Sequence, residues 1–193
     1  MKQLLVSGVR KMLPAGSVHL LEEQYRKTRA RVVSARYGNP ARHLKVIAVT
    51  GTNGKTTTVN YLNEILKETS YKTAMFSTAT IEIAGEARRN DLNATVAGTA
   101  AMQRFFRQAK KAHVDFVVME FPSHAIHQHK LQGVPVEMAI MTNLTQDHLD
   151  YHKTMEAYAE VKGRLFAARP KYIVLNRDDD WFDYFDKFQA DAQ

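Results

Sequence analysis

Residues 46–58 read VIAVTGTNGKTTT, and the fold of the remaining chain can be worked out from this stretch. An apolar run, a short turn with two glycines, and Lys55 followed by threonines predict a buried strand, a tight loop and the start of a helix. Glycines let successive backbone N–H groups curl around an anion, and a helix N-terminus adds partial positive charge. The stretch therefore predicts a loop that binds the phosphates of a nucleotide. An ordinary strand–turn–helix junction would show the same order of elements and is the alternative interpretation.

Seven consecutive residues of this loop are candidate ATP-binding residues: Gly51, Thr52, Asn53, Gly54, Lys55, Thr56 and Thr57. The Lys55 ammonium would reach the terminal phosphates, and the Thr56 hydroxyl would bind Mg²⁺. The match to the phosphate-loop pattern Gly-x₄-Gly-Lys-Ser/Thr is incomplete, because Val49 occupies the position of the first glycine.

Composition limits the classes of protein that the chain could belong to. Its 193 residues, 45% of them hydrophobic, suit a single domain with room for a small appendage. The lack of cysteine excludes disulfides, thiolate metal sites and a cysteine nucleophile. No apolar run is long enough to span a bilayer and no secretory signal follows Met1, so a cytoplasmic protein is expected.

The net charge of +7 is concentrated near the N-terminus. Residues 1–45 hold ten Lys or Arg and two Glu, whereas the remaining chain is close to neutral. A basic segment of this kind could touch nucleic acid or an anionic membrane surface. It could equally be a solvated helix face or a contact for an anionic substrate. We expect no nucleic-acid partner and keep peripheral membrane contact as an open alternative.

Apolar periodicity predicts strands and helices in alternation. Strands are expected at 46–49, 73–77, 80–83, 116–119, 138–141 and 172–175, and helices at 17–37, 55–68, around 102–109 and at 155–168. Ser17 would cap the first helix, and residues 86–98 are polar and irregular, as in a surface loop. The alternation predicts an α/β fold, a mostly parallel sheet with helices on both faces.

Ligands of parallel α/β sheets bind at the carboxyl ends of the strands. The glycine-containing loop, Glu120 and Asn143 all follow predicted strands directly. A carboxylate at the end of an apolar strand is where phosphate-loop proteins hold Mg²⁺. Glu120 is therefore a candidate metal ligand, although it could simply be the first solvated residue after its strand.

The histidines suggest a different site. His124, His127 and His129 lie close together in the chain, and His148 and His152 follow at a distance that would allow a zinc cluster. No cysteine and no His-Glu-x-x-His pattern accompany them. Imidazoles that cap helices or bind surface water are the more common explanation.

The segment 142–152 is unusually rich in polar groups, and a helix with one unusual lysine follows it. Helical spacing puts Lys162 on the same face as Met155, Tyr158, Leu165 and Phe166. An unpaired ammonium there would be costly, unless its long side chain reaches solvent. The alternative is a lysine that serves the nucleotide site, with its charge chemically altered.

Three stretches together resemble the Mur ligases, the ATP-dependent amide ligases of peptidoglycan precursor synthesis, and most of all the branch that extends UDP-N-acetylmuramoyl-dipeptides. These stretches are GTNGKTTT at 51–58, MEFPSHA at 119–125 and TNLTQDHLDYHKTMEAYAEVKGRLF at 142–166. The resemblance extends from about residue 44 to 176.

The resemblance implies catalytic roles for Lys55, Glu120, His148 and Lys162. Lys55 would bind the β- and γ-phosphates, and Thr56 with Glu120 would hold one Mg²⁺. His148 would help to hold a second Mg²⁺, and Lys162 would match the carbamylated lysine of the family. The implied reaction is phosphorylation of a substrate carboxylate by ATP, followed by attack of an amino acid's amine on the acyl phosphate.

The muramoyl-peptide side of the site departs from the family pattern. The expected substrate-binding residues are Asn93, Thr95, Ser123 and Lys130. Ser123 follows Pro122 where a second serine is usual, and Lys130 stands in place of an arginine. Thr95 begins Thr-Val-Ala where the family has Thr-Thr-Pro. Substrate identity is therefore less firmly predicted than use of ATP.

The predicted organisation is a basic helical segment at 1–43 and a partial central ATP-binding domain at 44–193, without the family's C-terminal domain. A folylpolyglutamate or cyanophycin synthetase relative is the alternative among enzymes, although the run DHLDYH argues against it. A nucleotide-binding interaction module that has lost catalysis is the alternative from another class.

Overall fold

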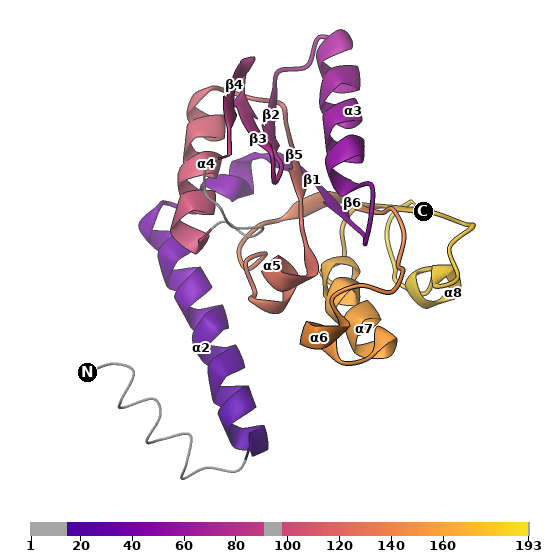
Figure 1. Ribbon diagram of the computed structural model, residues 1–193. Coiled ribbons are helices and arrows are strands. Elements are labelled where there is room, and N and C mark those ends of the chain that lie inside the picture. Colours follow the sequence, from indigo (N-terminus) through magenta and orange to yellow (C-terminus); the bar gives the residue numbers. More distant parts are fainter. Residues whose placement is uncertain (1–14, 91–97, 193) are drawn as a thin grey trace.

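A computed structural model describes residues 15–90 and 98–192 and has a seven-stranded sheet at its centre (Figure 1). The strands are β1 (Lys45–Thr50), β2 (Thr73–Phe76), β3 (Thr80–Ile83), β4 (Glu86–Arg89), β5 (Phe116–Glu120), β6 (Val136–Met141) and β7 (Tyr172–Leu175). Their order across the sheet is β4-β3-β2-β5-β1-β6-β7. The strands β2, β5, β1, β6 and β7 run parallel, and β3 and β4 form an antiparallel edge. The predicted α/β class with a mostly parallel sheet is confirmed.

Strand β1 lies in the middle of the parallel part, between β5 and β6. Val49 of β1 is paired with Glu120 of β5, and Thr50 with Met141 of β6. The carboxyl ends of these neighbouring strands therefore meet at one edge of the sheet. The loop after β1 begins at that edge.

Helices cover both faces of the sheet. The longer ones are α2 (Ala15–Arg36), α3 (Lys55–Glu68), α4 (Thr99–Lys111) and α7 (Met155–Phe166); shorter turns are η1 (Pro40–His43), α5 (Ser123–His127), α6 (Leu149–His152) and α8 (Phe182–Phe185). Figure 1 shows α3 and α4 on opposite sides of the sheet, with α2 beside α4. This arrangement gives two apolar layers, one on each face.

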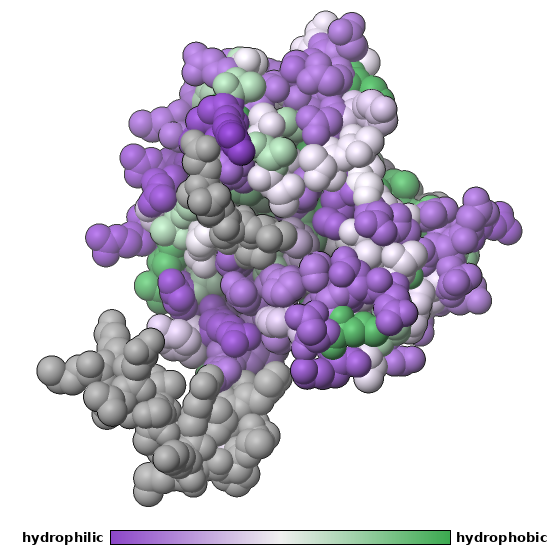
Figure 2. Space-filling view, in the orientation of Figure 1, coloured by the Kyte–Doolittle hydropathy of each residue, from purple (hydrophilic) through white to green (hydrophobic). Residues whose placement is uncertain are grey.

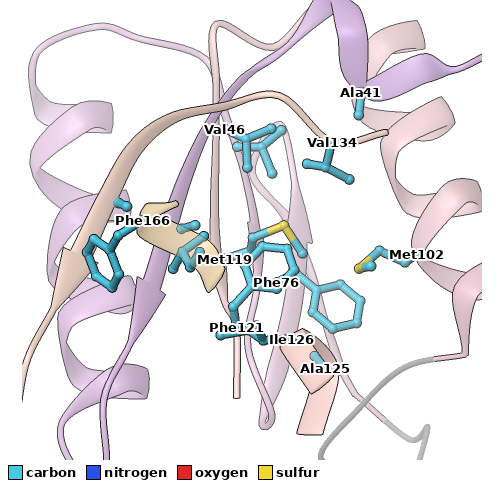
Figure 3. Close-up of a cluster of buried hydrophobic side chains, with 14 of the residues drawn as sticks. Ala41, Val46, Phe76, Met102, Met119, Phe121, Ala125, Ile126, Val134 and Phe166 are labelled. Carbon is cyan, nitrogen blue, oxygen red and sulfur yellow. The ribbon is translucent and has the colours of Figure 1, made fainter. Parts of the chain in front are cut away.

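Alternating residues of β1 divide between these layers. Ile47 and Val49 belong to a small cluster with Val59 of α3, whereas Val46 and Ala48 belong to a larger cluster on the opposite face. Figure 3 shows side chains of the larger cluster, among them Val46 and Met102, gathered between the sheet and its covering helices. Such alternation follows from the two-residue period of a strand buried on both faces.

Two local predictions were wrong. Residues 86–98 do not begin as an irregular loop, because Glu86–Arg89 pair antiparallel with β3 as an exposed edge strand. The polar sequence concealed the strand, since neither face of β4 is buried. The first helix already includes Ala15, so Ser17 lies inside it instead of capping it.

The outer surface of the domain is mainly hydrophilic on the face shown in Figure 2, with small scattered apolar patches. Within the described ranges, none of the helices combines the length and apolarity that a bilayer-spanning segment needs. The division of the chain at residue 43 into an appendage and a domain stays a prediction.

Candidate functional site

The loop after β1, residues 50–54 and called the phosphate loop below, is held by the segment that follows β6. The N–H of Thr52 donates to the Asn143 carbonyl at 2.9 Å, and the N–H of Asn53 donates to Asn143 Oδ1 at 2.9 Å. In return, the Thr142 hydroxyl donates to the Asn53 carbonyl at 2.7 Å. These bonds fix the loop, and they leave the first N–H groups of α3, which have no acceptor within the helix, as the backbone donors for an anion.

Gly51 packs directly against the segment that follows β6. Its φ of +149° lies in the region that favours glycine, and a Cβ built on it would overlap the Thr142 side chain. Gly54, at φ +80°, starts α3 in the left-handed conformation. The loop therefore depends on both glycines for its path, although the usual first glycine of the pattern is Val49.

Lys55 folds back over the phosphate loop. Its Nζ donates to the Thr52 carbonyl at 2.6 Å and to the Gly51 carbonyl at 3.0 Å. Partial burial lowers the pKa of Lys55, and the charges of Glu120 and Asp147 oppose that shift. A polyphosphate placed at the start of α3 would give this amine stronger acceptors than the two carbonyls.

Glu120 lies at the end of β5 beside the start of α3. Its Oε1 accepts from the N–H of Thr78 at 3.2 Å, and the Thr78 and Thr56 hydroxyls are 3.5 Å apart. Its Oε2 is buried and has no hydrogen-bond partner among the described residues. A buried carboxylate oxygen without a partner fits a hard cation such as Mg²⁺. Across residues 15–90 and 98–192, no group of three or more His, Asp or Glu is arranged as a ready-made metal site.

Lys162 of α7 is fully buried and points at the phosphate loop. Its Nζ donates to the Gly51 carbonyl at 2.8 Å and lies 3.4 Å from the Thr50 hydroxyl oxygen. The Tyr158 ring covers it, 4.6 Å from the ring centroid. Burial first, and then repulsion from Lys55, holds the pKa of Lys162 well below its usual value, and Asp147 partly opposes this. The predicted apolar face is confirmed, and the side chain does not reach solvent.

Aromatic and imidazole rings form one wall of the site. His152 is stacked on Tyr158 with centroids 4.8 Å apart, and its Nε2 shares a hydrogen bond of 2.9 Å with the Ser123 hydroxyl. The pKa of His152 is lowered to about 4, mainly by burial and then by His124. His148 packs edge-on against His124 at 5.2 Å and lies 3.5 Å from Asp147. A neutral His152 therefore orients Ser123, whereas His148 lies on the more exposed side of the cluster.

The predicted substrate-binding residues are only partly described. Ser123 lies in the site as the first residue of α5, while Asn93 and Thr95 fall outside the described residues. Lys130 is 93% buried near Arg29 of α2, and burial together with Arg29 lowers its pKa to about 8. The Glu23 carboxylate of the same helix lies 3.2 Å from His129 Nε2.

Three residues of the site were not predicted from the sequence: Thr78, Tyr158 as the cover of Lys162, and His152 as the partner of Ser123. Tyr158 carried a signal, because it lies four residues before Lys162 on the same face. Thr78 carried none beyond its place just after a strand.

The first prediction concerns Gly51. Gly51→Ala should destabilise the protein by at least about 1–2 kcal/mol, because a Cβ meets Thr142 at a φ that side chains rarely adopt. Urea denaturation measures the loss. The control is Gly98→Ala, since Gly98 has a negative φ and open space around its Cβ position. Equal stability of the two variants would contradict the close approach.

The second prediction concerns the pH dependence of Lys130. Between its folded pKa of about 8 and the ordinary 10.5, the unfolded chain holds more protons, so stability rises with pH across that window. Lys130→Met should therefore be more stable than the wild type at pH 7, and its advantage should shrink as the pH rises above about 8. Denaturation at several pH values tests this, with Lys72→Met, an exposed lysine, as control. A pH-independent difference would be inconsistent with a charged, buried Lys130.

Curated proteins with similar sequences show which family the chain resembles. The UDP-N-acetylmuramoyl-L-alanyl-D-glutamate–2,6-diaminopimelate ligase of Geobacillus kaustophilus is 41% identical over 179 residues, which cover 89% of this chain and 36% of that protein. The chain thus spans about a third of the length of the curated relatives it matches.

Solved structures give the same result. A ligase structure of that name superimposes with a TM-score of 0.67 at 36% identity, covering 75% of this chain and 29% of that one. A Mycobacterium tuberculosis folylpolyglutamate synthase structure gives 0.71 at 18% identity, covering 86% and 46%, and so shares the fold. Residues 49–193 match the family model described as "Mur ligase middle domain". The chain belongs to the Mur ligase family, as part of its middle domain.

Proposed function

We propose that the protein binds Mg-ATP at the phosphate loop and acts in the cytoplasm as an ATP-dependent amide ligase of peptidoglycan precursor synthesis. The observation that carries the proposal is the buried Oε2 of Glu120, which has no partner among the described residues. The other oxygen of Glu120 binds the N–H of Thr78, whose hydroxyl lies 3.5 Å from that of Thr56 at the start of α3. A cation held there would lie next to phosphates at the helix N-terminus, with Lys55 on the other side of the loop.

The proposed reaction has two steps. The γ-phosphoryl group of ATP is transferred to a carboxylate oxygen of a UDP-N-acetylmuramoyl-peptide, giving an acyl phosphate and ADP. The amine of an amino acid then attacks the acyl carbon, phosphate leaves, and the amine loses a proton to give the amide. Lys55 and the N–H groups of α3 would hold the phosphates, and Mg²⁺ would neutralise charge on the transferring group.

The peptide substrate would approach from the side of α5. Ser123 is fixed by His152 there, and Lys130 supplies a cation for a substrate carboxylate. Asn93 and Thr95 are proposed to act on the same side. Thr56 with Glu120 would hold one metal ion, and His148 with a modified Lys162 a second one.

A nucleotide-binding module without turnover is the second candidate, because the chain spans about a third of its curated relatives. Trapping the acyl phosphate separates the two. With Mg-ATP, the UDP-N-acetylmuramoyl-dipeptide and hydroxylamine, a ligase forms ADP and a substrate hydroxamate, even where the amino acid is missing. ATP binding without either product would favour the module over the ligase.

The third prediction concerns the phosphate contact of Lys55. Lys55→Ala should weaken ATP binding by on the order of 1.5–3 kcal/mol, the value of a hydrogen bond to a charged group. Isothermal titration calorimetry measures the affinity. Lys67→Ala is the matched control, since Lys67 lies in the last turn of the same helix, ion-paired with Glu64. Equal ATP affinities of the two variants would contradict the proposal that Lys55 of the phosphate-loop site binds ATP.

The fourth prediction is that CO₂ carbamylates Lys162. The lowered pKa favours a neutral amine, which attacks CO₂ and releases one proton, so that a neutral group becomes an anionic carbamate. The wild type in ¹³C-bicarbonate at about pH 8 should show a carbamate ¹³C resonance that Lys162→Met lacks. Identical spectra of the two proteins would contradict the modification. Lys162→Met should leave most of the ATP affinity in place, because Lys55 makes the phosphate contact.

A further inference from the structure

Helix α2 has two faces of different character. Ala30 and Ser34 are buried, with 2% and 1% of their surface exposed. Leu21, Tyr25 and Val32 are 55%, 66% and 61% exposed. At 100° per residue these three lie within about 40° of one another, and Ala30 lies about 180° from Leu21. The three exposed residues are called the outer stripe below.

Polar contacts of α2 with the rest of the domain come from Glu23 and Ser34, which lie off the outer stripe. Glu23 lies 3.2 Å from His129 and 3.8 Å from Arg164, and the Ser34 hydroxyl hydrogen-bonds to Gln103 of α4 at 3.5 Å. Figure 1 shows the helix alongside α4 over part of its length. The outer stripe is therefore exposed while the helix is docked on the domain.

The charges around the outer stripe are mostly positive. Arg29 and Arg36 flank it on one side and Arg31 on the other, each within about 80° of Leu21. Glu22 also borders the stripe, about 80° from Val32, and forms an ion pair with Arg26 at 3.5 Å, whereas Glu23 faces the domain. The face is thus an apolar centre with a border that carries three arginines and one glutamate.

This combination decides which partner the face fits. A second copy of the chain would bring the same arginines against one another, because a twofold interface joins identical patches. A purely ionic partner would gain nothing from the apolar centre. An anionic lipid surface offers acyl chains for the stripe and phosphates for the arginines.

We propose that the outer stripe of α2 inserts into the surface of an anionic lipid bilayer, with Arg29, Arg31 and Arg36 at the level of the headgroups. Arginine stems can lie along the apolar boundary while their charged heads stay in water. The sequence before α2 adds Lys2, Arg10 and Lys11 and no acidic residue to the same end of the chain. This peripheral contact is independent of the ligase proposal, since none of these groups lies in the phosphate site.

The lack of cysteine allows a direct test with the full chain. Val32→Cys carries an environment-sensitive fluorophore, and Tyr61→Cys, at an exposed apolar position of α3, carries the same label as control. Vesicles of phosphatidylglycerol and phosphatidylcholine should shift the emission of the label at 32 to the blue and leave that at 61 unchanged. Vesicles of phosphatidylcholine alone should give a much smaller shift.

Two sets of variants test the chemistry of the contact. Arg29→Gln, Arg31→Gln and Arg36→Gln combined should lower the vesicle partition coefficient at least tenfold. Arg104→Gln, Arg107→Gln and Lys110→Gln, on the exposed face of α4, remove the same charge and should change it less than twofold. Leu21→Ser, Tyr25→Ser and Val32→Ser combined should also lower it at least tenfold. Raising salt from about 0.1 M to 1 M should weaken wild-type binding, since the Debye length falls from about 10 Å to 3 Å.

Three results would overturn the proposal. Equal losses in the two charge sets would show diffuse attraction without a lipid-facing side of α2. An equal blue shift of the labels at 32 and 61 would show that the outer stripe does not insert into the bilayer. A shift at 32 that needs higher protein concentration and no vesicles would assign the stripe to self-association. Circular dichroism and thermal melting of each variant separate these results from loss of fold.

Discussion

The carbonyl oxygen of Gly51 accepts hydrogen bonds from two lysine amines, Lys55 Nζ at 3.0 Å and Lys162 Nζ at 2.8 Å. The two nitrogens therefore lie at most about 6 Å apart. Two full positive charges at that distance would repel by about 3 kcal/mol or more at an effective dielectric constant near 20, before screening by solvent. Complete burial of Lys162 reduces this repulsion, because burial favours its neutral form. Lys55 is only partly buried and keeps access to water.

The position of that carbonyl depends on chain segments that are distant in sequence. Thr142 and Asn143, in the segment after β6, hydrogen-bond to the phosphate loop. Lys162 of α7 donates to the Gly51 carbonyl of the same loop. Parallel pairing of β5, β1 and β6 puts these segments at one edge of the sheet. The site is thus preorganised by the topology of the sheet, which agrees with the general position of ligands in such folds.

The sequence predicted the parts of this arrangement that depend on local chemistry. The strand, glycine turn and lysine at 46–55 were enough to predict the loop. The 3.6-residue helical period was enough to predict that Lys162 lies on the buried face of its helix. It did not predict β4, because an exposed edge strand has no buried face and therefore no alternating pattern. It also missed the contact of Thr78 with Glu120 and the pairing of Ser123 with His152, since hydrogen bonds between residues 42 and 29 positions apart leave no local signal.

Lys162 and Glu120 are kept apart instead of forming an ion pair. A salt bridge between Lys162 and Glu120 would satisfy both groups and leave the site neutral, with little attraction for either a metal ion or a polyphosphate. Instead, the amine of Lys162 is covered by Tyr158 and bound to backbone, and one oxygen of Glu120 is bound to the Thr78 N–H while the other has no partner among the described residues. The second oxygen of Glu120 therefore remains an unsatisfied acceptor at this edge of the sheet, next to the free N–H groups that begin α3. In the proposed function, a cation at Glu120 and an anion at the start of α3 would satisfy these groups together, so the proposal favours a metal–nucleotide complex over either component alone.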